Sequence, residues 1–123
     1  MFLNIHILGK WNKCEIQNLL CDYDYLILPS KEEPFGIVLL EALASGIPCI
    51  VSNALGPNEI IKNKYNGLVF DKLSFDNFIE VMNISKSMDD SQYYDMCENS
   101  EKDALKYSTE NIVKKWIELI ESK

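Results

Sequence analysis

The 123-residue sequence predicts an α/β fold in which helices cover both faces of a parallel sheet, giving three layers. Three observations support this prediction. The apolar runs Tyr25–Leu28 and Pro48–Val51 are typical of strands that are buried on both faces. Segments with helical spacing of apolar residues lie between and after these runs. Turn residues, among them Gly46 and Asn66-Gly67, separate the segments from one another.

The elements before the first loop follow from local patterns. The segment Leu3–Leu8 alternates apolar and polar residues, and it predicts a strand with one buried face that stops at Gly9. Lys13–Asp22 carries apolar residues at helical spacing and predicts a short helix. The run Tyr25–Leu28 predicts the next strand, which Pro29 ends.

The rest of the sheet region is predicted in the same way. Gly46 stands where a helix C-terminal cap belongs, and Pro57 suits the first turn of a helix. The predicted elements are a helix from Phe35 or Gly36 to Ser45, the strand Pro48–Val51, a short helix from Pro57 to Ile61 and the strand Gly67–Phe70.

The C-terminal part is predicted to be helical. Phe75 to Met82 has apolar residues at i, i+3, i+4 and i+7 behind a possible Ser74 cap, and the polar stretch Asp89–Tyr107 predicts a second helix. A clear amphipathic stripe follows Thr109, a plausible cap; it consists of Ile112, Val113, Trp116, Ile117 and Ile120. We therefore expect one domain over residues 1–123, with the sheet part in 3–70 and the C-terminal helices in 74–121.

Composition excludes several classes of function. The net charge of −7 and the pI of about 4.6 make the chain a poor ligand for nucleic acid, whose phosphates demand basic surfaces. The four cysteines, Cys14, Cys21, Cys49 and Cys97, form no Cys-x-x-Cys pair, and the only histidine is His6, so no zinc site is expected. Scattered thiols predict a reduced, cytoplasmic protein, with Cys49 a small core residue.

The segment Glu33–Glu41 is the candidate functional site. Only apolar residues, Gly and Pro lie between its two carboxylates, and a carboxylate within an apolar helix is costly unless something pairs with it. The first amides of the helix, around Phe35, Gly36 and Ile37, lack intrahelical partners and lie at the positive end of the dipole, which suits a phosphate. Gly36 also lets a phosphate approach the backbone closely.

The two carboxylates extend this anion site in opposite directions. Glu41 lies about one turn into the helix and can accept hydrogen bonds from neutral hydroxyls such as a ribose diol. Glu33 precedes the helix and can reach a group on the far side of the phosphate. Ligands of parallel sheets bind beyond the carboxyl ends of the strands, where the loops Gly9-Lys10, 30–34 and 52–56 are expected. Diol, diphosphate and hexose are the successive parts of a sugar nucleotide.

Simpler interpretations stay open at this point. Glu41 could be a solvated helix residue, Glu33 could merely complement the helix dipole, and Gly36 could be an ordinary helix-start glycine. Glu59 could be an acid at the start of a helix. His6 is most simply explained as an outward-facing residue of the first strand.

The motifs resemble a known family. Pro29-Ser30, the run Glu33-Pro-Phe-Gly-Ile-Val-Leu-Leu-Glu41-Ala-Leu-Ala-Ser-Gly46 and the run Ile47-Pro-Cys-Ile-Val-Ser52 are similar to the donor half of retaining GT-B glycosyltransferases of the group 1, or family 4, type. Glu59 and Asn66-Gly67-Leu-Val match later parts of the same pattern. The resemblance covers Ile5 to Phe70 well and the C-terminal helices loosely.

This resemblance implies a fold, an activity and residue roles. The fold would be a Rossmann-like, partial C-terminal domain of a GT-B enzyme, and the parent activity would be hexosyl transfer from a nucleotide diphosphate sugar to a glycan or lipid-linked acceptor, with retention. Glu41 would bind the ribose and Glu33, the implied catalytic residue, would lie beside the transferred sugar. Amides around Phe35, Gly36 and Ile37 would contact the diphosphate and hexose, and Gly9-Lys10 would lie near the base. No metal or other cofactor is implied.

The departures from the family pattern are large. The strand and loop that carry the family's phosphate-clamping Arg and Lys are absent from this sequence, as is the acceptor domain through which the full enzyme would meet its acceptor and, peripherally, a membrane. Pro34 replaces the usual Gly and removes one N–H donor. In the family's strand order Leu3–Leu8 is separated from the other strands by two that are missing here.

We therefore expect a donor-domain fragment that binds donor weakly and does not turn over alone. One alternative is a non-catalytic remnant or a split-enzyme subunit that binds a partner chain. Another is a nucleotide-sugar epimerase of GT-B shape, although the run from Phe35 to Ala42 fits transferases better.

Overall fold

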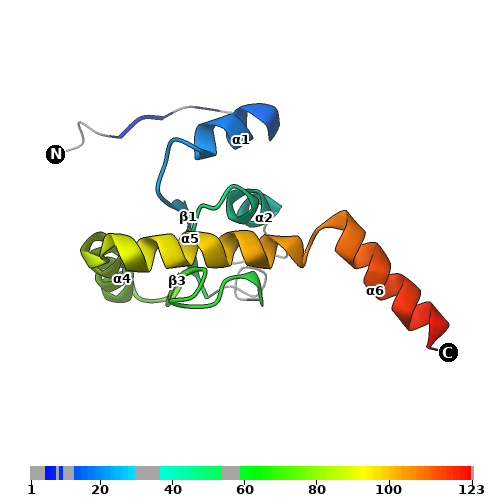
Figure 1. Ribbon diagram of the computed structural model, residues 1–123. Coiled ribbons are helices and arrows are strands. Elements are labelled where there is room, and N and C mark those ends of the chain that lie inside the picture. The colour runs from blue at the N-terminus through cyan, green and yellow to red at the C-terminus, as the bar shows by residue number, and fades with distance from the viewer. Residues whose placement is uncertain (1–4, 8, 10–12, 30–36, 54–58, 123) are drawn as a thin grey trace.

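The computed structural model describes residues 5–7, 9, 13–29, 37–53 and 59–122. Figure 1 shows how the assigned elements are arranged along and around the sheet. The strands of this part are β1 (Leu26–Leu28), β2 (Cys49–Ser52) and β3 (Gly67–Phe70). The helices are α1 (Lys13–Leu20), α2 (Ile37–Ala44), α4 (Phe75–Ser87), α5 (Asp90–Leu105) and α6 (Thr109–Glu121), and Glu59 and Ile60 are helical as well.

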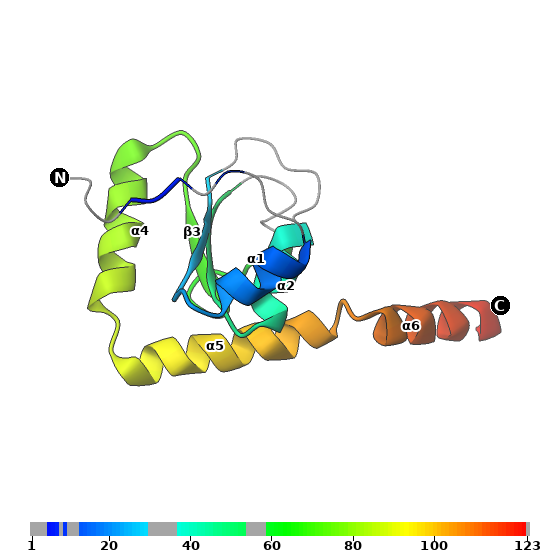
Figure 2. The ribbon, with the colours of Figure 1, turned by 90° about the horizontal axis from the view of Figure 1, so that it is seen from above.

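The three strands form one parallel sheet in the order β1-β2-β3. Leu26 lies opposite Cys49, and Cys49 lies opposite Gly67. Helices α1 and α2 lie on one side of the sheet, α4 lies on the other, and α5 runs across one end of it (Figure 2). The predicted three-layer parallel α/β fold is thereby confirmed.

Each face of the sheet has its own apolar core. On the α2 face, Cys49 and Val51 pack with Leu39 and Leu43 of the helix, all of them fully buried. On the α4 face, the buried members are Ile50, Leu68, Phe70, Val81 and Met96. Successive side chains of β2 enter the two clusters in turn, because neighbouring residues of a strand point to opposite faces and both faces are covered here. Its uninterrupted apolar sequence is therefore explained.

Local signals set the helix ends that the sequence predicted. Gly46 has φ of +73°, its N–H donates to the Leu43 carbonyl at 2.9 Å, and the N–H of Ile47 donates to the Ala42 carbonyl at 2.9 Å. This pair of bonds is the Schellman motif, which requires the left-handed conformation that glycine adopts without strain. The Ser74 hydroxyl accepts from the Asn77 N–H at 3.1 Å and caps α4.

The predicted first strand is wrong for the residues that the structure describes. Residues 5–7 have no regular structure, and Ile5 and Ile7 are 65% and 96% exposed, so no apolar face is buried there. An alternating pattern makes a strand only where a neighbouring strand can take its hydrogen bonds. Within the described sheet β1 pairs with β2 and β2 with β3, and neither pairing involves residues 5–7.

Two further apolar segments are more exposed than their sequences predict. Tyr25–Leu28 was expected to be buried on both faces, but β1 begins at Leu26 and Ile27 is 39% exposed. Helix α6 forms where the amphipathic stripe predicted it, yet Trp116 is 61% exposed and the helix projects away from the sheet (Figure 1). None of the helices in the described ranges combines the length and the apolar character that a membrane crossing requires.

Candidate functional site

The candidate site is at the carboxyl edge of the sheet. Because the strands are parallel, β1, β2 and β3 end at the same edge, at Leu28, Ser52 and Phe70. Helix α2 leads from this edge back to the start of β2, and Figure 2 shows the helix beside the sheet. Its first residue, Ile37, is therefore at the end of the helix nearer this edge. The amides that start α2 therefore face the region where ligands of such sheets bind.

Most of the predicted donor-binding residues cannot be placed. Glu33, Phe35, Gly36 and Lys10 lie outside the described residues, as does the loop 30–34. Gly9 is described: it is exposed, has φ of +76°, and has open space on the side where a Cβ would stand. Roles assigned to these positions remain predictions.

Glu41 is the predicted site carboxylate that the structure does describe. Its helix neighbours Leu39, Ala42 and Leu43 are completely buried, whereas Glu41 itself is half-buried. The Glu41 carboxylate is thus neither fully buried nor freely solvated. A carboxylate on the rim of an apolar helix face is accessible to a polar ligand and partly shielded from water, which strengthens the hydrogen bonds it accepts.

Glu41 also borders a hollow between three helices. This hollow of about 970 Å³ lies between α1, α2 and α5 and includes Asn18, Ala44 and Ser45. It is at the C-terminal end of α2, away from the amides at Ile37. The charged residues that line it are Glu41, Glu98, Glu101 and Lys102. Three carboxylates against one ammonium group repel a diphosphate, so this hollow is not the expected donor site.

A buried polar cluster ties the loop before β3 to α5. The Asn66 side chain is fully buried; its Nδ2 donates to Asp103 Oδ2 at 2.7 Å and to the Ile60 carbonyl at 3.2 Å, and its Oδ1 accepts from the Lys62 N–H at 2.7 Å. Ser100 donates its hydroxyl hydrogen to the Asn66 carbonyl at 3.1 Å. Every polar atom of the Asn66 side chain therefore has a partner, as burial requires.

Two lysines compensate the charge of the cluster. Asp103 is almost completely buried, and its carboxylate lies 3.1 Å from Lys106 Nζ and 3.9 Å from Lys62 Nζ. The hydrogen bond from Lys106 to Asp103 raises the pKa of the ammonium group. From the sequence, Asn66-Gly67 was assigned to a turn and matched to the family pattern, and the burial of the Asn66 side chain was not predicted. The residue that buries Asn66 is Asp103, which lies within a polar helix. Its sequence context does not distinguish it from an exposed Asp, because its burial depends on the loop that packs against α5.

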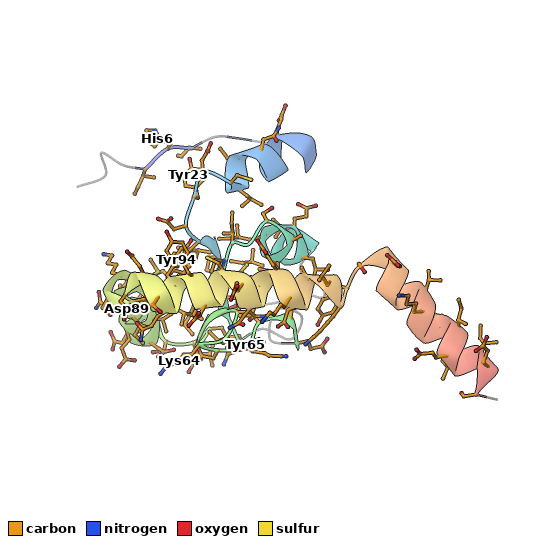
Figure 3. All side chains as sticks on the ribbon, in the orientation of Figure 1. His6, Tyr23, Lys64, Tyr65, Asp89 and Tyr94 are labelled. Atoms are coloured by element: carbon orange, nitrogen blue, oxygen red, sulfur yellow. The ribbon has the colours of Figure 1, made fainter. Side chains whose placement is uncertain are left out.

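The same loop is held at its outer side. Figure 3 shows Lys64 and Tyr65 on this loop beside α5, with His6 far from them on the N-terminal segment. Asn99 of α5 donates to the Tyr65 carbonyl at 3.0 Å, and Lys64 has φ of +65°. His6 is exposed, and residues 5–7, the described part of the strand to which its simplest explanation assigned it, have no regular structure.

The fold and this edge define the chain as a Rossmann-like α/β domain of the kind that binds ligands at the carboxyl ends of its strands. The family can be stated more narrowly. A sequence model of the family "Glycosyl transferases group 1" matches residues 3–104, and the chain belongs to this family.

Two curated relatives illustrate the match. The chain is 38% identical over 68 residues to the UDP-Gal:alpha-D-GlcNAc-diphosphoundecaprenol alpha-1,3-galactosyltransferase of Escherichia coli. This match covers 55% of this chain and 18% of that protein. It is 31% identical over 121 residues to the N,N'-diacetylbacillosaminyl-diphospho-undecaprenol alpha-1,3-N-acetylgalactosaminyltransferase of Campylobacter jejuni, covering 96% of this chain and 31% of that protein. The chain therefore spans less than a third of the length of each.

Solved structures share the fold. A glycosyltransferase from Rickettsia africae superposes with a TM-score of 0.82 at 23% identity, over 96% of this chain and 31% of that one. Anabaena HepE in complex with UDP superposes with a TM-score of 0.77 at 22% identity, over 90% and 31%. The C-terminal domain of a group 1 glycosyl transferase from Francisella tularensis superposes with a TM-score of 0.69 at 24% identity, over 85% and 53%.

Proposed function

We propose that this chain is part of the donor-binding half of a glycosyltransferase. The parent activity is transfer of a hexosyl group from a nucleotide diphosphate sugar to a glycan or lipid-linked acceptor, with retention. The observation that carries the proposal is the position of α2: the helix that contains the second Glu of the matched motif begins at Ile37, at the carboxyl edge of a parallel sheet.

The relatives support the substrate class. The Escherichia coli and Campylobacter jejuni proteins are, by their names, transferases whose acceptors are sugars on diphosphoundecaprenol, and the Anabaena structure contains UDP. We extend these substrates to the present chain as part of the proposal. Retention follows from the family resemblance of the motif, and it is proposed on that basis.

The proposed roles follow the chemistry of the segment 33–41. The amides of residues 35–37 bind the diphosphate, and stabilise it as the leaving group, because they present partial positive charge that needs no reorganisation. Glu41 accepts hydrogen bonds from the ribose, and Glu33 lies beside the transferred hexose. The base lies near Gly9 and Lys10. The net charge of −7 opposes a diphosphate, so affinity for the donor is low in this chain alone.

Calorimetric titration with UDP, GDP and their sugars tests the proposal. We expect one of these nucleotides to bind the wild-type chain, and Glu41→Ala to weaken that binding about tenfold or more, the loss of about 1.4 kcal/mol. Glu98→Ala is the matched control, because Glu98 lines the same hollow as Glu41 but belongs to α5. Absence of binding by the wild type at millimolar nucleotide, or equal losses in both variants, would contradict the proposed donor site.

A non-catalytic role is the second candidate, favoured by the net charge of −7, which opposes the binding of a diphosphate. In that role the chain is a remnant, or a subunit that acts only with a partner chain. A transfer assay with labelled sugar nucleotides separates the candidates: turnover by the isolated chain would exclude the non-catalytic role, and turnover only after a second polypeptide is added would support the subunit role.

A further inference from the structure

A second hollow lies at the amino edge of the sheet, opposite the edge where α2 begins. It has a volume of about 600 Å³ and lies between the loop before β3, the end of α4 and the first turns of α5. Lys64 and Tyr65 belong to that loop, which enters β3 at Gly67 (Figure 3). The volume is within the range of about 300–1,000 Å³ that small-molecule sites occupy. Glu41 and Ile37 do not line this hollow.

One face of α5 forms a wall of the hollow. Gln92, Asp95, Met96 and Asn99 line it, and their spacing of i, i+3, i+4 and i+7 is that of a single helix face. Met96 and the Leu68 side chain of β3 are almost completely buried, so they form an apolar floor. The polar side chains of the wall stand around this floor. The hollow therefore combines an apolar base with a polar rim, as binding sites for small molecules do.

Two amide side chains of the rim are held in place by the protein itself. The side-chain oxygen of Gln92 accepts from the Asp89 N–H at 3.1 Å in the box that caps α5, and Asn99 Nδ2 donates to the Tyr65 carbonyl at 3.0 Å. These bonds use the oxygen of Gln92 and the nitrogen of Asn99. The NH₂ group of Gln92 and the Oδ1 atom of Asn99 are left for a ligand, which does not have to order either side chain.

Lys64 adopts a conformation that its residue type disfavours. Its φ of +65° is in the left-handed region, where Gly or Asn is accommodated at lower cost than a long side chain. The Lys64 ammonium group makes no ion pair or hydrogen bond with the residues that the structure describes. The fold thus gains nothing from this side chain in return for the strain. Strained positions of this kind are concentrated at binding sites.

The lining indicates the chemical class of the ligand. Lys64 and Asp95 are the charged residues among those that line the hollow, so their charges cancel. Lys64 and Gln92 offer donors, whereas Asp95 and Asn99 offer acceptors. A ligand that suits them is uncharged and carries groups that both donate and accept, as hydroxyl groups do. An apolar ligand would leave these rim groups without partners.

A pyranose ring satisfies all of these conditions. Its hydroxyl groups point outward around the ring, and its C–H groups form an apolar face. The floor of the hollow suits that face, and so does the ring of Tyr65, which is 40% exposed at the margin of the hollow. A nucleotide diphosphate suits the hollow less well, because the carboxylate of Asp95 would repel it.

We propose that this hollow is a binding site for a neutral saccharide. Lys64 and Gln92 donate to the hydroxyl groups of the saccharide, Asp95 and Asn99 accept from them, and the C–H face of one sugar ring lies over the apolar floor beside Tyr65. The inference goes beyond the proposed function and does not depend on it, because this hollow and the start of α2 are at opposite edges of the sheet.

NMR titration of the ¹⁵N-labelled full chain tests the proposal. The probes are maltotriose, triacetylchitotriose and galactotriose, three neutral saccharides that differ in the orientation and substitution of their hydroxyl groups. We expect at least one to bind with a Kd of about 1 mM or lower, and to shift the amide signals of residues 64–65 and 92–99 most. Absence of binding by all three probes would overturn the proposal, as would shifts centred on the start of α2.

An acidic residue of the same helix supplies a matched control. Asp95→Ala removes an acceptor of the rim, and it should weaken binding of the saccharide about tenfold, because hydrogen bonds to charged groups are the stronger ones. Glu98→Ala removes the next carboxylate of α5, which lines the other hollow, and it should leave the Kd unchanged. Equal losses in the two variants would overturn the proposal.

Lys64→Asn separates binding from stability. Asn tolerates the left-handed conformation better than Lys, so the Tm should stay the same or rise. Saccharide binding should nevertheless weaken about tenfold, because the ammonium donor is lost. A fall in Tm together with lost binding would give Lys64 a structural role and overturn the proposal, and so would unchanged binding. No nucleotide is present in these measurements, so a failed donor titration would contradict the proposed function and leave the saccharide result standing.

Discussion

Removal of the Asn66 side chain should destabilise this protein more than any other single polar truncation in its neighbourhood. The side chain is fully buried and makes three hydrogen bonds, one of them to the Asp103 carboxylate. A bond to a charged group contributes about 1.5–3 kcal/mol and a neutral one about 0.5–1.5 kcal/mol, so Asn66→Ala should lower the free energy of unfolding by about 2.5–6 kcal/mol. That is a large share of the roughly 5–15 kcal/mol typical of a domain.

The matched control is Asn63→Ala. Asn63 is exposed, three residues away, and its Oδ1 accepts one hydrogen bond, from the Val69 N–H at 3.0 Å. Its loss should lower the free energy of unfolding by about 1 kcal/mol or less. Urea unfolding followed by circular dichroism measures both variants, and an unchanged m-value would show that the comparison concerns stability alone.

The reasoning can also fail in a defined way. If Asn66→Ala lowers the free energy of unfolding by no more than Asn63→Ala does, the buried cluster does not hold α5 to the loop. A double-mutant cycle with Asp103→Ala should give a coupling free energy of about 0.5–3 kcal/mol, because the two side chains are in direct contact. A coupling of zero would show that the contact contributes nothing of its own.

Two further predictions concern β2 and β3. A Cβ at Gly67 would meet the Cys49 carbonyl and Ile61, so Gly67→Ala should lower the free energy of unfolding by about 1–3 kcal/mol or more in urea titrations. Gly9→Ala has open space around the Cβ but a positive φ, and it should lower the free energy of unfolding by about 1–2 kcal/mol. Burial raises the pKa of the Cys49 thiol from its ordinary 9.0 to about 12, so iodoacetamide at pH 8 should label it only in urea, as mass spectrometry can show. Equal labelling with and without urea would refute the burial of this thiol. As pH rises, the thiol of the unfolded chain ionises before that of the folded chain, so the free energy of unfolding should fall between pH 9 and about 12 by about 1.4 kcal/mol per pH unit.

Helix ends and the positions of β1, β2 and β3 were predictable because their causes are local. The Ser74 cap needs only a hydroxyl three residues before an amide, and the Gly46 cap needs only a residue that tolerates positive φ. The family motif was recognisable for the same reason, since Glu33, Gly36 and Glu41 lie close together in sequence. Candidate site residues could thus be named, although the structure describes only Glu41 of these three.

Burial was not predictable where it depends on a distant segment. Asn66 was assigned to a turn, but it is buried because Asp103 lies opposite it, 37 positions along the chain. Ile5, Ile7 and Ile27 have the patterns of strand residues with a buried face, and each is exposed because no neighbour covers it in the described structure.

By itself, then, the sequence determined most of the secondary structure of the described residues, the parallel α/β class and the family motif, since each depends on residues a few positions apart. Only the tertiary structure decided which apolar segments are covered, because burial depends on the neighbour that a residue meets in space. Ile50 and Ile27 show the difference: both lie within uninterrupted apolar strands. Among the strands that the structure describes, Ile50 has one on each side, whereas Ile27 has one on a single side.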